Sequence, residues 1–462
     1  MKLTSSIFLK CCFISGYLSC KKTQMEDEMM NSFELLESNV RSYSRVFGDV
    51  FRTAKNSMMF TEEGKCFLDF FAGAGALNYG HNPDFIKGKL LEYIGSDAVV
   101  HGLDMYTTAK RTFIETFNEL ILAPKGLDYK LMFCGPTGTN AVEAALKLAR
   151  KAKKRTGIFS FSGGFHGMSY GALAATGNLY NRGGAGAPLH NVTFMPYPYG
   201  FNESFDTIGY MENVLTDANS GIEKPAAVIL ETVQAEGGVI VAPAEWLQRL
   251  SALCKEHDIL LIVDDIQVGC GRTGSFFSFE RAGIRPDLVV LSKSISGYGL
   301  PMSLLLLKPE LDVWQPGEHN GTFRGNQLAF VGATAALEFR ISSNLEESVK
   351  EKEAWVSDYL QKEIVPLHPA ITVRGLGLIW GIDLGGLEGG EQAAKFVASR
   401  CYDQGLIIER SGRNDTVVKL MPALTIDSEL LEQGCKIVKE ALAAYFEQAG
   451  LSARKEATLE PV

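Results

Sequence analysis

Short apolar strands alternate with amphipathic helices through the middle of the chain, and this alternation limits the possible folds more than any other feature. The pattern predicts strands over residues 129–134, 156–161, 192–195, 226–231, 259–264 and 288–291. It predicts helices over residues 139–154 and 246–257. Strands separated by helices favour a mainly parallel sheet that is covered on both faces. We therefore predict an α/β fold whose large domain is built on such a sheet.

The pattern changes toward both ends of the chain. The sequence predicts a helix over 33–47, a strand over 65–71 and a helix over 83–94. After the alternating region it predicts helices over 326–340 and 346–364, strands near 371–373, 378–382 and 417–420, and a closing helix over 428–448. These elements predict a smaller α+β domain built from both chain ends. The predicted boundaries are 31–90 for an N-terminal segment that joins the small domain, 91–343 for the large domain, 344–450 for the C-terminal small domain, and 451–462 for a tail.

Residues 1–30 differ in kind from the rest of the chain. An apolar stretch over 7–19 is interrupted by Lys10. A signal peptide is one interpretation of this segment. We favour a disordered upstream extension or a misplaced start codon, because the apolar stretch is short and three methionines between positions 25 and 30 offer later starts.

Charge and composition narrow the class of partner. The 462-residue chain carries a net charge of −9, so it offers no basic field for nucleic acid or anionic lipid. No apolar run reaches the ~20 residues of a membrane span. The nine cysteines form no CxxC pair and no ligand cluster with histidine, so no metal site is predicted. We expect free thiols, a cytoplasmic location, and a protein that acts on small molecules.

Two neighbouring apolar strands end in side chains that suit one cofactor. The strand over 259–264 ends in Asp264, and Lys293 follows the strand over 288–291. Pyridoxal phosphate needs a lysine to form its Schiff base and an acid to keep its pyridine nitrogen protonated. The alternative is a lysine that reaches solvent and an aspartate that caps a turn. Both strands together, with a candidate phosphate turn, favour pyridoxal phosphate as the cofactor.

Two glycine-containing turns add further groups. Residues 135–140 join a strand directly to a helix, where backbone N–H groups and the helix dipole favour a phosphate. Thr137 and Thr139 add hydroxyl donors, although a capping turn without a ligand is the alternative. In the second turn, Phe165 and His166 lie between glycines, and an exposed aromatic ring can stack on a flat heteroaromatic ring. A histidine with a purely structural role is the alternative there.

In this order the motifs resemble the class III (ω-amino-acid) aminotransferases of pyridoxal-phosphate fold type I, from about residue 33 to 447. The resemblance implies amino and oxo acids as substrates, a homodimer or an oligomer of dimers, and sites at the subunit interface. The implied roles are Lys293 for the Schiff base, Asp264 for the pyridine nitrogen, Gln267 near the ring hydroxyl, Gly138 and Thr139 for the phosphate, Phe165 stacked on the ring, and Thr322 reaching the phosphate from the other subunit. The predicted cofactor-binding set is completed by Thr137, His166 and Glu231.

Three segments, over 70–81, 135–147 and 318–326, resemble one branch of this family. Members of the branch convert L-aspartate 4-semialdehyde and L-glutamate to L-2,4-diaminobutyrate and 2-oxoglutarate, for ectoine synthesis or for siderophores and peptides. One alternative is another ω-amino-acid aminotransferase, of the ornithine or 4-aminobutyrate type. A second is a non-catalytic protein that uses the cofactor fold for binding. Retention of Lys293, Asp264 and the phosphate turn argues against the second alternative.

One strand departs from the wider class. An arginine usually ends this strand and binds the α-carboxylate of the amino donor, whereas the segment 417–422 carries Lys419 here. Lysine keeps the charge but loses the bidentate fork. Glu236 resembles the family's gating acid, and we predict that it pairs with Lys419 and turns away for glutamate. Arg324 is the candidate for the carboxylate at the far end of the substrates, and a surface or structural ion pair is the alternative for both predictions.

Overall fold

The computed structural model describes residues 32–200 and 205–451 of the chain. A seven-stranded sheet forms the larger half of the molecule. The strands are β4 (Lys130–Phe133), β5 (Ile158–Phe161), β6 (Val192–Met195), β7 (Ala227–Leu230), β10 (Leu260–Asp264), β11 (Leu288–Leu291) and β12 (Leu304–Leu307). They lie in the order β4-β12-β11-β10-β7-β5-β6. Strands from β11 to β6 pair in parallel, whereas β12 is antiparallel to both β4 and β11. The predicted mainly parallel sheet is confirmed, and β12 is a strand that the sequence analysis omitted.

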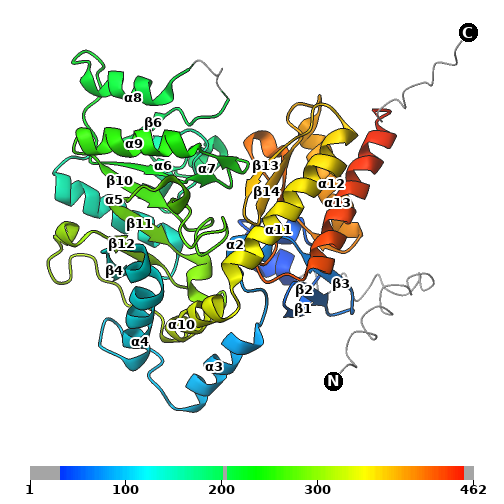
Figure 1. Cartoon of the computed structure of the whole chain (residues 1–462), viewed down its shortest axis with the longest axis horizontal. Coiled ribbons are helices and arrows are strands. Elements are labelled where there is room, and N and C mark those ends of the chain that lie inside the picture. Colours follow the sequence, from blue (N-terminus) through cyan, green and yellow to red (C-terminus); the bar gives the residue numbers. More distant parts are fainter. Residues whose placement is uncertain (1–31, 201–204, 452–462) are drawn as a thin grey trace, which may run out of the picture.

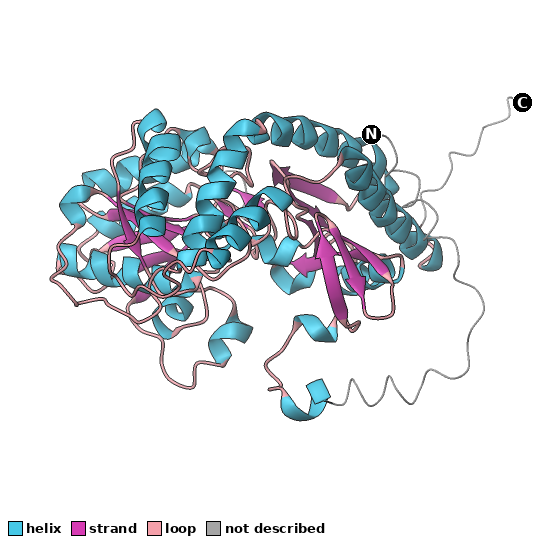
Figure 2. Ribbon diagram, turned by 90° about the horizontal axis from the view of Figure 1, so that it is seen from below, coloured by secondary structure: helices cyan, strands magenta, loops and turns pink. Residues whose placement is uncertain are grey.

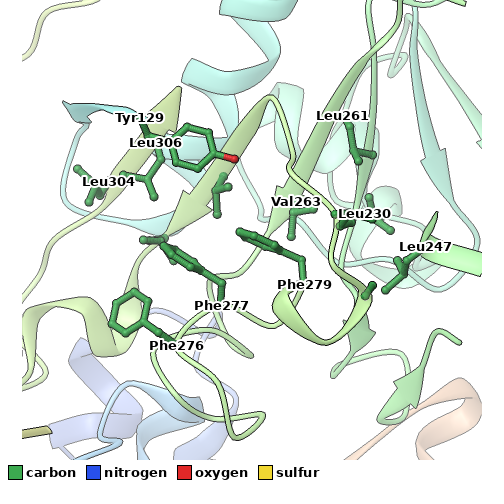
Figure 3. Close-up of a cluster of buried hydrophobic side chains, with 14 of the residues drawn as sticks. Tyr129, Leu230, Leu247, Leu261, Val263, Phe276, Phe277, Phe279, Leu304 and Leu306 are labelled. Carbon is green, nitrogen blue, oxygen red and sulfur yellow. The ribbon is translucent and has the colours of Figure 1, made fainter. Parts of the chain in front are cut away.

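Both faces of this sheet are buried. Successive side chains along each strand point to opposite faces, so each strand contributes to both buried clusters. Leu261 and Val263 of β10 belong to one buried cluster, and Leu260 and Ile262 belong to another. The first face is covered by α4 (Thr108–Phe117), α8 (Thr207–Thr216), α9 (Ala244–Glu256) and α10 (Gln327–Ser342), and the second by α5 (Gly138–Lys153) and α6 (Tyr170–Ala175). Figure 3 shows Phe277 on the first face, where a loop that follows β10 packs onto the strands.

Both ends of the chain build the smaller half of the molecule (Figures 1 and 2). One sheet contains β1 (Phe51–Lys55), β2 (Met58–Thr61), β3 (Cys66–Asp69) and β15 (Leu406–Ile407), and the other contains β13 (Thr372–Leu376), β14 (Ile379–Asp383), β17 (Val417–Leu420) and β16 (Glu409–Ser411). The parallel pairing of β3 with β15 joins the two chain ends. The helices α11 (Leu345–Tyr359), α12 (Gly390–Asp403) and α13 (Ser428–Gln448) pack onto this half. The exact domain boundaries stay a prediction.

The predicted helix over 33–47 is wrong. Helical backbone ends at residue 36, and a separate 3-10 turn, η2 (Tyr43–Arg45), follows it. The Oγ of Ser38 accepts the backbone N–H of Val40 at 3.3 Å, and such local bonds compete with helix continuation. None of the η2 residues is buried, so no packed apolar face offsets the cost of forming a longer helix.

Some predictions fall on parts of the chain that the structure does not describe. The predictions for residues 1–30, and for all but the first residue of the 451–462 tail, lie outside the described residues. Within the described ranges, no helix combines the length and the apolar character that crossing a bilayer requires.

Candidate active site

Lys293 and Asp264 lie at one edge of the large sheet, because they end neighbouring parallel strands. Asp264 is the last residue of β10 and pairs in register with Val290. One residue separates the end of β11 from Lys293. Lys293 has a left-handed backbone, with φ 52°, which a non-glycine residue adopts only when its surroundings enforce it. Its Nζ donates to the carbonyl of Ala74, in the short helix α2 (Ala72–Gly75), at 2.8 Å. Burial lowers the pKa of Lys293, which favours a neutral, nucleophilic amine.

The Asp264 carboxyl group is fixed by a buried histidine. The Nδ1 of His166 lies 2.7 Å from Oδ2 of Asp264, and Oδ1 accepts the backbone N–H of Ile266 at 3.1 Å. Burial acts to lower the pKa of His166, but the hydrogen bond that His166 donates to Asp264 and the charge of that carboxylate outweigh burial and raise that pKa. The Nε2 of His166 is buried and has no hydrogen-bond partner in the described part of the chain. The arrangement holds a buried carboxyl group at the end of β10, close to the start of the Lys293 turn.

The N-terminus of α5 forms a turn suited to an anion. Thr137 is the N-cap residue of this 16-residue helix. A Cβ atom at Gly138 would lie 2.8 Å from Cδ1 of Ile266, so a larger residue would force the Ile266 side chain to move. The hydroxyl of Thr139 is hydrogen-bonded to the hydroxyl of Ser169 and accepts the Ser169 backbone N–H at 3.2 Å. Backbone N–H groups and the helix dipole favour a phosphate at this position.

A cavity of 660 Å³ opens beside Lys293 and Phe165. The backbone N–H of Phe165 donates to Oε1 of Glu231 at 2.8 Å, and burial raises the pKa of Glu231 to about 7. This bond fixes the backbone of Phe165 at the cavity wall. The wall also contains Glu236, so a charged side chain from the turn after β8 (Val233–Gln234) reaches the space next to the lysine.

Lys419 is completely buried and is shared by two carboxylates. Its Nζ lies 2.8 Å from Oε1 of Glu236 and 2.8 Å from Oε1 of Glu409. Burial acts to lower the pKa of Lys419, but the two carboxylates outweigh burial and raise it. Burial acts to raise the pKa of Glu236, but the charges of Lys419 and Lys293 outweigh burial and lower that pKa to about 2. For Glu409, burial is the stronger effect and raises the pKa to about 7. Gln267 links this cluster to the cofactor side, since its Nε2 donates to Oε1 of Glu236 at 3.0 Å.

Two of the predicted site residues lie apart from this cluster. Thr322 is exposed and Arg324 is half-buried in the loop that precedes α10, and neither lines the cavity beside Lys293. The Nη1 of Arg324 donates to Oδ1 of Asn320 at 3.4 Å. Their roles toward a partner subunit or a substrate stay predictions.

Several cavity residues were missed by the sequence analysis. Among them, Arg410 lies in β16, Arg413 lies in the turn between β16 and β17, and Tyr43 comes from η2. The two arginines precede Lys419 by fewer than ten residues, which was the only signal in the sequence. That signal does not tell which side of the hairpin faces the cavity. Tyr43 is about half exposed, and partial desolvation raises its pKa to about 12, so its hydroxyl keeps its proton.

The chain is similar to known enzymes over most of its length. The model of the family Aminotransferase class-III matches residues 41–442. The diaminobutyrate–2-oxoglutarate transaminase of Halalkalibacterium halodurans is 54% identical over 425 residues, which is 92% of this chain and 98% of that protein. The proteins of the same name from Bordetella parapertussis and Streptomyces coelicolor are 55% and 53% identical, over 89% of this chain and 94% and 97% of their own.

Solved structures share the fold at lower sequence identity. The ornithine aminotransferase of Toxoplasma gondii superposes with a TM-score of 0.81 at 23% identity, over 93% of this chain and 96% of that chain. A Bacillus anthracis aminotransferase superposes with a TM-score of 0.80 at 25% identity, over 92% and 100%. The predicted pyridoxal-phosphate fold type I is therefore confirmed.

The functional groups of the residues at the sheet edge are those that binding of pyridoxal phosphate requires. Lys293 offers an amine, Asp264 a buried carboxyl group and Phe165 an aromatic face, beside a turn that favours phosphate. Two buried polar atoms, Nε2 of His166 and Oε1 of Gln267, have no hydrogen-bond partner among the described residues and are available to a polar ring. The chain belongs to the class III aminotransferase family and is a pyridoxal-phosphate-dependent enzyme.

Proposed function

We propose that this enzyme transfers the amino group of L-glutamate to L-aspartate 4-semialdehyde and yields L-2,4-diaminobutyrate and 2-oxoglutarate. The observation that carries the proposal is its 53–55% identity, over 89–92% of the chain, to relatives named diaminobutyrate–2-oxoglutarate transaminase. Lys293 and Asp264 are both present, so the chemistry that the reaction needs is retained.

Each residue at the sheet edge has a distinct role in this proposal. Pyridoxal phosphate supplies an electron sink for the carbon that gains or loses its amino group. Lys293 would hold the cofactor covalently, and its free amine would move a proton to or from the reacting carbon. Asp264 would stabilise positive charge on the ring nitrogen, and Phe165 would supply an aromatic face to the ring. The turn at Gly138 binds the phosphate through backbone N–H groups.

The two amino donors present different charges next to the reacting carbon. Glutamate carries a carboxylate on that carbon, whereas diaminobutyrate reacts through its terminal amine and carries none there. One pocket can serve both donors if the cation for the α-carboxylate is masked when diaminobutyrate binds. Glu236 is suited to mask Lys419, because it is ionised and lies 2.8 Å from the Lys419 Nζ.

An exchange of carboxylates explains how Glu236 could turn away at little cost. Breaking a buried ion pair usually costs about 3–5 kcal/mol, because one charge is left unpaired. When glutamate binds, its α-carboxylate takes the place of the Glu236 carboxylate beside Lys419. Glu409 stays in contact with Lys419 in both states, so the buried ammonium group keeps two carboxyl partners.

We also propose a homodimer or an oligomer of dimers. Exposed apolar side chains, Met105 and Tyr106, lie on the segment before α4, and Phe323 lies next to Thr322 in the loop before α10. The rings of His101 and Phe323 are 5.4 Å apart, so the two segments are adjacent. A second copy of the chain would cover this apolar surface and bring Thr322 to its neighbour's phosphate. A sedimentation mass of a single chain would remove this part of the proposal.

The use of the product is a further proposal. Diaminobutyrate is a precursor for ectoine, or for siderophores and peptides, and deletion of the gene should abolish accumulation of one of these compounds. We place the reaction in the cytoplasm because buried cysteines such as Cys134 and Cys254 are free thiols, as in a reducing compartment. Secretion of the active enzyme would contradict this location.

The preference of the enzyme among amino donors distinguishes the proposed reaction from those of ornithine and 4-aminobutyrate aminotransferases. The holoenzyme is mixed with diaminobutyrate, ornithine or 4-aminobutyrate without an oxo acid, and loss of visible cofactor absorption is followed in a single turnover. We expect the largest second-order rate constant for diaminobutyrate. A larger value for ornithine or 4-aminobutyrate would replace the proposal by the corresponding alternative.

Lys293→Ala should retain pyridoxal phosphate through the phosphate turn and lose transamination by several orders of magnitude. The loss follows because the variant has neither the covalent attachment nor the amine that carries the proton. Absorption spectra measure the bound cofactor, and turnover with glutamate measures the catalytic loss. Turnover close to that of the wild type would rule out this role.

Asp264→Asn should lower turnover by up to about 1,000-fold, because two opposite charges about 4 Å apart attract by roughly 4 kcal/mol before desolvation. The substitution keeps the shape of the side chain and removes its charge. Asp265→Asn is the matched control, since Asp265 is a neighbouring buried acid whose pKa burial raises to about 7. A large loss in the control with none in Asp264→Asn would assign the role to Asp265.

Glu236→Ala should impair the half-reaction with diaminobutyrate more than the half-reaction with glutamate. Without the mask, the Lys419 charge faces a carbon that carries no carboxylate in diaminobutyrate. Glu409→Gln is the control, because Glu409 contacts the same ammonium group but does not line the cavity, and it should affect both halves alike. Equal losses in both halves for Glu236→Ala would contradict the mask.

A further inference from the structure

Arg410 and Ser411 lie on the wall of the cavity that contains Lys293 and Glu236. They belong to β16, which pairs antiparallel with β17, the strand of Lys419. Nothing above assigns either residue a function. The position of β16 brings this strand to the wall of the space in which the amino donor must lie.

Both residues carry a buried polar atom without a hydrogen-bond partner in the described chain. These atoms are Nη1 of Arg410 and Oγ of Ser411. The other terminal nitrogen of Arg410, Nη2, lies 3.7 Å from Oδ2 of Asp415, beyond the range of a hydrogen bond, and the Asp415 side chain is 59% exposed. An arginine has five N–H donors and no acceptor, so a buried N–H group without a partner favours an incoming anion.

The β16–β17 hairpin is held firmly against the loop that carries Glu236. The backbone N–H of Gly412 donates to the carbonyl of Glu236 at 3.0 Å. A Cβ atom at Gly238 would lie 3.1 Å from Cα of Gly412, so the two backbones approach closely. Arg410 therefore projects from a strand whose position relative to Glu236 is set by backbone contacts, as a substrate-positioning residue requires.

The two amino donors share one chemical feature at the end remote from the reacting amine. In glutamate, two carbons separate the reacting carbon from the side-chain carboxylate. In diaminobutyrate, two carbons separate the reacting carbon from the α-carboxylate. A single cation at a fixed distance from Lys293 can therefore bind the far carboxylate of both donors. Ornithine places that carboxylate one carbon farther away.

We propose that Arg410 binds the far carboxylate of both amino donors, a role that rests on the proposed function. The guanidinium fork matches the two oxygens of a carboxylate. Arg410 thereby sets the length of donor that the site accepts, while Lys419 and Glu236 distinguish the groups next to the reacting carbon.

Other cations near the site are less suited to this role. Lys419 already contacts two carboxylates. Arg413 also lines the cavity, but it is exposed and its guanidinium group lies 5.3 Å from the centre of the Tyr199 ring, in a cation–π contact. Arg324 does not line the cavity within one chain.

The first test measures binding without catalysis. Glutarate is a dicarboxylate of the length of glutamate and has no amine, and its Kd for the holoenzyme is measured by calorimetry. We expect Arg410→Gln to raise this Kd by about 10-fold or more, and Arg410→Lys to raise it less, because lysine keeps the charge and loses the fork. Arg413→Gln and Arg324→Gln are the comparison variants. An unchanged Kd in Arg410→Gln, or a larger rise in either comparison variant, would overturn the proposal.

The second test removes the carboxylate from the donor. 1,3-Diaminopropane is diaminobutyrate without its carboxylate, and single-turnover rates are measured for both amines. Arg410→Gln should lower kcat/KM for diaminobutyrate by about 10-fold or more and leave that for diaminopropane within about 2-fold. Equal losses for both amines would mean a structural role and contradict the proposal. If the wild type converted neither glutamate nor diaminobutyrate, the proposed function would fail, while the glutarate affinities would still report on Arg410.

Discussion

The parallel pairing of β10 with β11 places an acid and a lysine at one edge of the sheet, and the rest of the active site is arranged around that edge. Asp264 ends the first strand and Lys293 follows the second. Because carboxyl ends of parallel strands meet at the same edge, turns that are distant in sequence converge there. The N-terminus of α5 packs on Ile266, and the Phe165 turn is fixed by Glu231. Burial of both sheet faces holds these turns in place.

Burial also makes the charges at this edge interdependent. Lys419 is completely buried, and burial of its ammonium group is tolerated because Glu236 and Glu409 lie within 2.8 Å. A buried cation with two carboxylates can exchange one of them for a substrate carboxylate without losing its charge balance. This exchange is the basis of the account of how one pocket handles an α-amino acid and a terminal amine. Arg410, on the neighbouring strand, would hold the end that both donors share.

The central part of the fold, and the position of Asp264 and Lys293 at one edge of its sheet, are predictable from the sequence, because each buried strand is a short apolar run that ends in a polar or glycine-containing turn. β12 is less predictable, since its four consecutive leucines show no alternation and leucine also favours helices. The approach of Arg410 to the cavity depends on a contact between Gly412 and Glu236, which are far apart in sequence. Local patterns do not encode such a contact, so the guanidinium group could be found only in the folded chain.

In the proposed exchange, Glu236 masks Lys419 when diaminobutyrate binds and moves away from it when glutamate binds. Crystal structures of the enzyme with stable, reduced conjugates of the cofactor with diaminobutyrate and with glutamate would distinguish the two positions of Glu236. With the diaminobutyrate conjugate, the distance between Nζ of Lys419 and Oε1 of Glu236 should stay near 2.8 Å. With the glutamate conjugate, Glu236 should lie beyond hydrogen-bond distance and the substrate carboxylate should contact Lys419. The same Glu236–Lys419 contact in both structures would rule out the exchange of carboxylates.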